Sequence, residues 1–313
     1  MVLALLHTGA QLSPSGFSIH ISTVIGIVAL AALYEREGRG ERGEGRKLPR
    51  SGTSDPRNSD SPLTSDISHL ESGSLLPSPR SALPSPTQRA WFYLGLATLF
   101  FSLNGPLHDL SDTFLFSAHM VQHFVLTLIV APLLIMGTPG QMLRPALRVK
   151  GVAPLARWLT KPTHSFALFS VVFAGWHIPA LYNYALAHHP VHIVEHLMML
   201  VTAVLMWWPV LSPMPELPRL SYPGQMLYLF LLTLPMSIVA IYITMANTVL
   251  YPFYASAPRV WGITPMNDQL MGGLIMWIPG GLFFYGIISI VFLRWQQRDG
   301  VESQAGAQVG WSH

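Results

Sequence analysis

The stretch SAHMVQHFVLTLIVAPLLIMG, residues 117–137, decides the fold. It is predominantly apolar, and a helix of about 20 such residues is long enough to cross a bilayer. The same stretch contains His119 and His123, four residues apart. Residues at this spacing share one face of a helix, so two imidazoles lie together inside a hydrophobic segment. Ionisable groups are costly to bury in a membrane and therefore indicate a functional site.

Comparable hydrophobic segments recur along the whole chain. Half of its residues are hydrophobic and only 11% are charged, whereas about a quarter are charged in a typical soluble domain. We therefore expect an all-α, polytopic membrane helix bundle of seven transmembrane helices. The first is expected to be an anchored span and not a cleaved signal peptide, because it lacks a basic n-region and a small-residue cleavage site. The expected spans are 18–34, 90–103, 113–136, 165–187, 191–211, 225–247 and 270–294.

The basic residues predict the orientation of this bundle. If the N-terminus is outside and the C-terminus is cytoplasmic, every lysine and arginine except Arg259 falls on the cytoplasmic side. This distribution follows the positive-inside rule. The pI of 9.3 is then a consequence of membrane topology, and no nucleic-acid partner is needed to explain it.

One segment, 35–89, differs in composition from the rest of the chain. It begins with alternating charges and continues with many serines and prolines. Such a sequence cannot bury enough apolar surface to fold, so we expect a disordered cytoplasmic linker; a partner-docking tail is the alternative. The remaining expected units are an N-terminal transmembrane helix at 1–34, a six-helix membrane core at 90–295 and a cytoplasmic tail at 296–313.

Histidines from three expected spans lie at similar depths. His119 and His123 belong to one span, His177 to the next, and His192 and His196, again four apart, to the third. With the N-terminus outside, all five lie in the outer half of the bundle. We therefore predict that they form a metal site open to the outer face. The structural alternative is that each imidazole merely bonds a backbone carbonyl of a neighbouring helix.

The absence of cysteine limits the ligands that such a site can use. The chain contains none, so a metal must be bound by histidine, methionine, carboxylate or backbone oxygen. Imidazole suits copper and zinc, and thioether favours cuprous copper, so copper is the metal we expect on the outer side. We place His108 and Asp268 at the entrance, and expect Glu195 and Met199 next to the ligands, with the carboxylates of Glu195 and Asp268 able to orient imidazoles.

Other histidines and aromatic residues are expected to lie elsewhere. We expect His188 and His189 in a solvated loop. Membrane-interface positions are expected for the aromatic residues near span ends, namely Trp176, Tyr182, Tyr184, Trp207 and Trp208. The histidines expected to lie outside the site are His7, His20, His69 and His164.

Several motifs, in this order and spacing, resemble one protein family. They are SAHMVQHFVLTLIVAPLLIMG (117–137), WHIPALYNYAL (176–186), HIVEHLMML (192–200), WWPVL (207–211), LPMS (234–237) and NDQLMGGLIMWIPGG (267–281). The chain is similar over 90–295 to the CtaG family of cytochrome c oxidase assembly factors. This resemblance implies a seven-span protein of the bacterial plasma membrane that is not an enzyme and helps to build a caa-type oxidase.

The resemblance also implies a cargo and partners. The cargo is copper, and the partners are cytochrome c oxidase subunits, subunit II above all, together with other copper chaperones and membrane lipid. The residues by themselves leave two alternatives open. One is an intramembrane zinc-dependent hydrolase, with zinc on His123, His177 and His196 and water activated by Asp268. The other is a b-type haem protein with axial histidines from two helices.

Overall fold

The computed structural model describes residues 19–44 and 84–310, and every regular element within these two ranges is a helix. The prediction of an all-α protein is therefore confirmed for the described residues. The first half comprises α1 (Ile21–Glu44), α2 (Pro86–Ser102), α3 (Pro106–Asp109), the π-helical η2 (Leu110–Phe114), α4 (Phe116–Phe124), the π-helical η3 (Val125–Val130), α5 (Ala131–Gly137) and α6 (Gly140–Arg148). The second half comprises α7 (Val152–Leu159), α8 (Pro162–Trp176), α9 (Pro179–Ala187), α10 (His189–Leu211), α11 (Tyr222–Thr244), α12 (Pro252–Ala255) and α13 (Pro265–Gly310).

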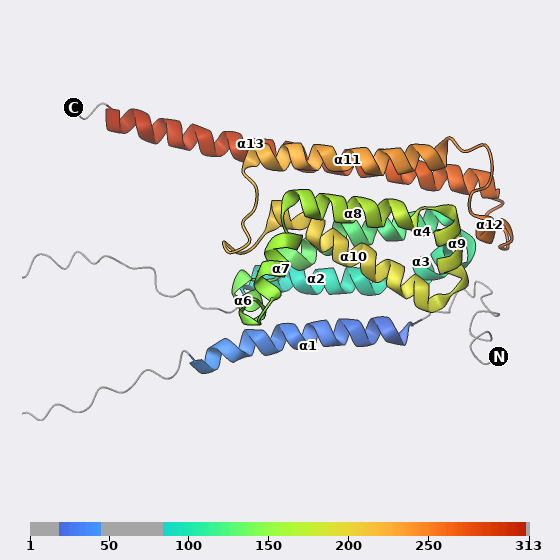
Figure 1. Cartoon of the computed structure of the whole chain (residues 1–313), viewed down its shortest axis with the longest axis horizontal. Helices are drawn as coiled ribbons and strands as arrows, with labels where there is room; N and C mark the ends of the chain where they lie inside the picture. Colours follow the sequence, from blue (N-terminus) through green and yellow to red (C-terminus); the bar gives the residue numbers. More distant parts are fainter. Residues whose placement is uncertain (1–18, 45–83, 311–313) are drawn as a thin grey trace, which may run out of the picture.

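The long helices run side by side along a common direction (Figure 1). The short helices α3, α9 and α12 lie at one end of the bundle, and α6 and α7 lie at the other. Close packing of α11 on α13 is possible because Gly273 has no side chain: a Cβ there would meet Thr244 and the carbonyl of Ala240. Deeper in the bundle, the rings of Trp207 and Phe284 stack with their centroids 5.9 Å apart.

Among the described residues, four segments are long and apolar enough to cross a membrane. They are Phe116–Gly137, His189–Leu211, Tyr222–Thr244 and Pro265–Asp299. The pair α8 and α9, bent by 72°, makes a fifth if it is one broken span. The chain is thus a multi-pass membrane protein. The expected spans at 18–34 and 90–103 fall on α1 and α2, which are not in this set, so the count of seven stays a prediction.

The bend between α8 and α9 follows from proline. Pro179 has no backbone N–H, so the helix cannot continue with its normal hydrogen bonds. In a continuous helix, the carbonyl of Gly175 would accept from the N–H of residue 179, which proline lacks. It accepts instead from the N–H of Ile178, at 3.1 Å. His177 lies at the end of α8, directly before this break. The break therefore holds its imidazole at the turn between two helices.

Helices continue past the expected unit boundaries. Helix α1 extends through Glu44, so residues 35–44 are helical and the expected disorder does not begin at 35. Residues 45–83, which hold most of the expected linker, lie outside the described residues, as do 1–18 of the expected N-terminal unit. Helix α2 begins at Pro86 because Ser85 and Gln88 form a capping box. At the other end, α13 continues through Gly310, within the expected tail.

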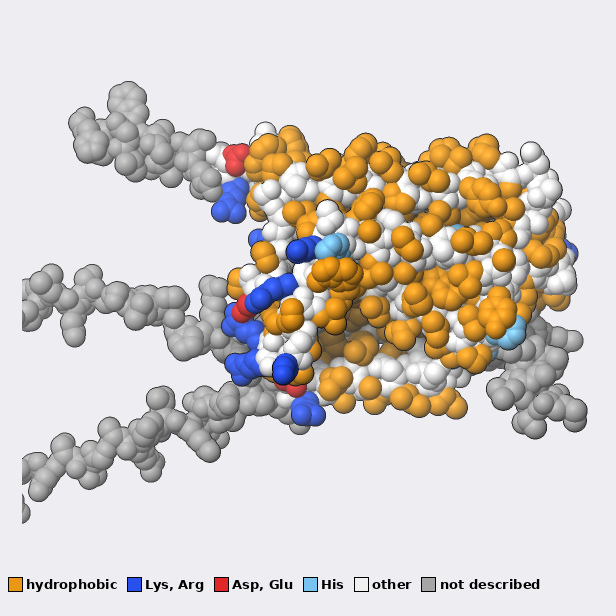
Figure 2. All heavy atoms as spheres, in the orientation of Figure 1, with side chains coloured by type: hydrophobic (Ala, Val, Ile, Leu, Met, Phe, Trp, Pro, Cys, Tyr) orange, Lys and Arg blue, Asp and Glu red, His pale blue; other side chains and the backbone are white. Residues whose placement is uncertain are grey.

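Basic side chains gather at the end of the bundle that carries α6 and α7 (Figure 2). Two of them form ion pairs there, Arg89 with Glu35 at 2.7 Å and Arg144 with Glu216 at 2.8 Å. Arg259 lies next to α12, at the opposite end, where its guanidinium donates to the carbonyl of Tyr254. The charge separation expected from the sequence is thus present among the described residues.

Candidate metal centre

Two helices supply the side chains of the candidate site. Helix α4 carries His119 and His123, and α10 carries His192, Glu195 and His196; all five side chains are buried. The spacing of four residues on each helix directs the paired imidazoles to one face, as expected. The two faces meet, so the structure brings the histidines of these two helices together.

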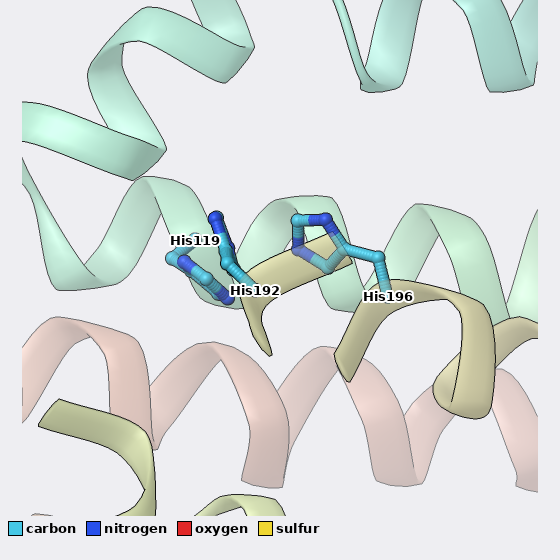
Figure 3. A group of neighbouring side chains, drawn as sticks. All are labelled: His119, His192 and His196. Carbon is cyan, nitrogen blue, oxygen red and sulfur yellow. The ribbon is translucent and has the colours of Figure 1, made fainter. Parts of the chain in front are cut away.

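Donor atoms from the two helices lie close enough to share one ion. One ring nitrogen from each of His119, His192 and His196 lies within 4.8 Å of the other two (Figure 3). A second, overlapping group consists of His119, His123 and Glu195. The Nε2 atoms of His119 and His123 are 2.9 Å apart, and Oε1 of Glu195 lies 3.8 and 3.5 Å from them. Glu195 is therefore positioned as a direct ligand, closer to the centre than expected.

Hydrogen bonds fix which nitrogen of His119 is available. The hydroxyl of Tyr254 donates to the carbonyl of Ser111 at 2.6 Å, which uses its single proton. Nδ1 of His119 lies 3.3 Å from the same hydroxyl. Because that hydroxyl has no second proton, Nδ1 must be the donor in this contact. A neutral imidazole has one proton, so Nε2 of His119 carries a lone pair directed toward His123 and Glu195.

Asp112 fixes His192 in the same way. Its Oδ2 lies 3.3 Å from Nδ1 of His192 and 3.2 Å from Nε2 of His108. The other nitrogen of His108, Nδ1, accepts from the amide of Gln122, whose orientation is set by a second bond to the carbonyl of Ser102. A histidine that gives its second N–H to a carboxylate is typical of metal sites. Asp112 therefore leaves Nε2 of His192 free to bind a metal.

The electrostatics outside the spans agree with this arrangement. Burial lowers the pKa of His108 to about 4, although the Asp112 carboxylate opposes it, so His108 is neutral at physiological pH. Burial raises the pKa of Asp112, but the facing His192 and His108 and the Ser111 hydroxyl outweigh it and bring the pKa to about 2. Asp112 is consequently a permanent anion at the edge of the site.

Several polar atoms at the centre are buried without a hydrogen-bond partner. Among the described residues they include Nε2 of His177, His192 and His196, Nδ1 of His123 and both carboxylate oxygens of Glu195. An unsatisfied buried polar group costs about 1–3 kcal/mol, and more if charged. Native proteins leave few such atoms unsatisfied, and a bound cation is one partner that would satisfy this cluster. The residues present thus fit a metal ion bound by imidazole and carboxylate.

His177 lies beside the cluster, next to His123. Its Nδ1 donates to the carbonyl of Phe173 at 2.6 Å, so its buried Nε2 carries the lone pair. The centroid of its ring lies 5.8 Å from that of His123. Neither of the two groups with converging donor atoms includes it. His177 is therefore the next imidazole beyond the cluster and not one of its central members.

Asp268, expected at the entrance or next to the ligands, has its carboxylate bound to the start of α4. Its carboxylate accepts the backbone N–H groups of Phe116 and Ser117 at 2.7 and 3.0 Å, and the Ser117 hydroxyl at 2.5 Å. A carboxylate at a helix N-terminus satisfies donors that have no partner within the helix. Asp268, on α13, thus caps α4 and holds it in place. The same contacts occupy the carboxylate of Asp268, which the hydrolase alternative requires to activate water.

Met199, expected next to the ligands, is fully buried in the main hydrophobic core, three residues after His196 on α10. The expected interface positions of two aromatic residues need correction. Tyr182 and Trp207 are buried too and do not lie at the membrane interface: the ring centroid of Tyr182 is 5.2 Å from that of His119, and Trp207 donates to the carbonyl of Thr127.

His20 lies against the site, although the sequence placed it elsewhere. Its ring centroid is 4.2 Å from that of His108 and 5.9 Å from that of His189. Its backbone N–H donates to the side chain of Asn104. His108 does lie at the edge of the cluster, as expected. No sequence pattern predicts His20, Asp112 as an orienting group or Tyr254, because their partners lie on other elements.

Comparison with known proteins identifies the family. The family model for the cytochrome c oxidase caa3 assembly factor, Caa3_CtaG, matches residues 76–298. Uncharacterized proteins of Mycobacterium bovis and Mycobacterium tuberculosis are each 28% identical over 226 residues, which cover 67% of this chain and 34% of theirs. An uncharacterized protein of Mycobacterium leprae is 26% identical over 201 residues, or 59% of this chain and 30% of its own.

This chain therefore spans about a third of the length of the curated relatives it matches. No solved structure matches it. The family model covers well over half of the chain and includes all the helices that build the cluster, α4 and α10 among them. The resemblance seen in the sequence is confirmed, and the chain belongs to the caa3-type cytochrome c oxidase assembly factor family.

Proposed function

We propose that this protein binds copper between α4 and α10 and delivers it to cytochrome c oxidase during assembly. The observation that carries the proposal is the convergence of unpartnered imidazole nitrogens and the Glu195 carboxylate in a buried pocket. Membership of the oxidase assembly family supports the oxidase as the client. Subunit II is the acceptor we propose, with other copper chaperones as donors.

His119, His192 and His196 form the principal ligand set in this proposal, and His123 and Glu195 supply exchangeable alternatives. Two imidazole nitrogens that are each about 2.0 Å from a metal lie about 3–4 Å apart, which is close to the spacing found here. A surplus of donors suits a cargo, because an ion can leave one ligand after another without being released to water. Imidazole, with no competing thiolate, binds both oxidation states of copper.

The proposed topology places this pocket in the outer half of the plasma membrane. If α1 and α2 also span, they join the four apolar spans and the bent α8–α9 pair to give seven. The end with α6 and α7 then lies in the cytoplasm, in agreement with the positive-inside rule. The N-terminus lies outside, and copper is taken up and released on the outer side.

Metal content of the purified full chain tests the proposal. The detergent-solubilised protein, stripped with a chelator, is incubated separately with cuprous, cupric and zinc ions, desalted and analysed for metal. We expect retained copper, and loss of it in a double variant, His119→Ala with His192→Ala. His164→Ala is the control, because His164 lies at the basic end, where it bonds the carbonyl of Trp158. Equal copper in the double variant, or retention of zinc alone, would refute the proposal.

A further inference from the structure

The helices α6 and α7 connect two membrane segments at the basic end of the bundle. They join the span that ends at Gly137 to the bent α8–α9 pair, which begins at Pro162. The connection, 138–161, therefore lies at a surface of the bilayer, whichever side faces the cytoplasm. Helix α6 is attached to the bundle, because Met142 packs in a buried cluster with Phe92. Helix α7 is not attached in this way: none of its residues, all of which the structure describes, is buried.

Large apolar side chains of α7 point away from the protein. Leu155 and Trp158 are 55% and 53% exposed, and residues three apart share one face of a helix. Trp158 is held in position by His164: the centroids of the two rings are 4.5 Å apart, and the carbonyl of Trp158 accepts from Nδ1 of His164 at 2.7 Å. Removal of such a face from water is favourable, so we expect an apolar phase to cover it.

Basic side chains surround this apolar face (Figure 2). Four of them are exposed and, within the ranges 19–44 and 84–310, form no ion pair: Arg148, Lys150, Arg157 and Lys161. Arg144, by contrast, is paired with Glu216. The sequence contains no aspartate or glutamate between Asp112 and Glu195. The positive charge of the connection is therefore not balanced by its neighbours along the chain.

The combination of apolar and basic side chains restricts the partner. Dissolved phosphate or a nucleic acid would pair with the basic groups but leave Leu155 and Trp158 in water. Acidic phospholipid satisfies both, because its acyl chains cover apolar side chains and its phosphate attracts lysine and arginine. Tryptophan is also enriched at the boundary between hydrocarbon and headgroups. The position of α7 at the end of a span places it at this boundary.

We propose that α7 lies in the membrane interface and binds acidic phospholipid. Leu155 and Trp158 enter the acyl region, and Arg157 and Lys161 contact the headgroup phosphates. Neutral phospholipid offers the same acyl chains without net negative charge, so acidic lipid gathers around α7 in preference to it. This binding requires no metal and is tested independently of the copper proposal.

Fluorescence quenching by lipid tests the proposal. The chain contains no cysteine, so a Leu155→Cys variant can be labelled with bimane at that position alone. The labelled full chain is reconstituted into phosphatidylcholine vesicles with the same minor fraction of brominated phosphatidylglycerol or brominated phosphatidylcholine. Bromine on the acyl chains quenches the label only on contact. We expect the phosphatidylglycerol to quench about twofold more or better, since basic side chains near the surface attract acidic lipid.

Two further variants of the labelled chain locate the effect. Arg157→Gln with Lys161→Gln is expected to make the two lipids quench equally. Arg36→Gln with Arg294→Gln removes the same charge from exposed positions on α1 and α13 and is expected to keep the difference.

Four results would overturn the proposal. The two brominated lipids could quench the labelled chain equally, the Arg157 and Lys161 substitutions could leave the difference intact, or the control substitutions could abolish it as fully. The fourth is quenching by aqueous iodide and by neither lipid, which would show that α7 stands clear of the bilayer.

Discussion

His192 presents only one of its ring nitrogens to the candidate metal centre, because Asp112 accepts the proton on the other. His119 is fixed similarly by the hydroxyl of Tyr254. These two contacts decide where lone pairs lie before any ion binds. Preorganisation of this kind lowers the cost of binding, since neither ring has to rotate or exchange its proton.

Replacement of Asp112 tests this orienting role. In an Asp112→Asn variant, His192 and His108 lose the anionic acceptor that they share, and we expect copper affinity to fall about 10–100-fold, as for other orienting carboxylates of metal sites. Competition with a chromophoric cuprous chelator measures the change. Glu216→Gln, which removes a carboxylate at the basic end, is the control and leaves the affinity unchanged. Unchanged affinity in Asp112→Asn would show that His192 is not oriented by this carboxylate.

Tyr254 offers a test of the second contact. Its hydroxyl joins Ser111, His119 and Tyr182. Removing it in Tyr254→Phe leaves buried groups unpartnered, so we expect the free energy of unfolding to fall by about 1–3 kcal/mol. We also expect a lower affinity for copper. Thermal unfolding and the chelator competition report the two effects. Tyr184→Phe, at an exposed tyrosine, changes neither, and a Tyr254 variant that behaved like it would contradict the network described above.

At the scale of elements, the decisive contact joins α13 to α4. Helix α4 is nine residues long, with π-helical turns on both sides, and its own N-cap residue, Leu115, provides no side-chain bond. Asp268 supplies that cap from a different helix. The position of His119 and His123 is therefore set partly by a residue about 150 positions later in the chain.

Asp268→Ala distinguishes a cap from an entrance residue. The variant loses three bonds to a carboxylate, and bonds to charged groups contribute about 1.5–3 kcal/mol each at most, so we expect a clearly lower midpoint of thermal unfolding. Copper stoichiometry measured well below that midpoint is retained. Asn267→Ala is the neighbouring control, since its side chain is exposed. A variant of normal stability that bound no copper would restore the entrance role.

The elements that the sequence could predict are those whose cause is local. The hydrophobic runs at 113–136, 191–211, 225–247 and 270–294 correspond to the four apolar spans, because length and apolarity are properties of each run. The pairing of histidines at intervals of four likewise follows from helix geometry. Asp112, Tyr254 and Asp268 act on residues of other helices, and neither periodicity nor composition records such contacts. His20 was misplaced for the same reason.

At the scale of the whole molecule, charge and chemistry separate along the bundle. Apart from Arg259, the described basic side chains gather around α6 and α7 (Figure 2). The imidazole cluster contacts Asp112 and, on α12, Tyr254; α12 lies at the opposite end of the bundle (Figure 1). Placement of charge determines how such a protein inserts. The proposed orientation therefore fixes the side of the membrane from which the pocket is filled.

The absence of cysteine makes this orientation directly measurable. A single thiol is introduced at an exposed position at either end, Ser256→Cys next to α12 or Val149→Cys between α6 and α7. In intact cells, a membrane-impermeant maleimide is expected to label the first variant and not the second. Permeabilised cells provide the control, since both positions then react. The reverse pattern in intact cells would invert the proposed topology and place the pocket on the cytoplasmic side.

The hydrogen bonds of Asp268 to α4 couple the movement of two helices. Ser117, which it holds through both backbone and side chain, is two residues from His119. A tilt of the last helix against its neighbours would drag the first turn of α4 with it and alter the spacing between His119 and the rings on α10. The spacing of the candidate ligands is thereby coupled to the orientation of α13.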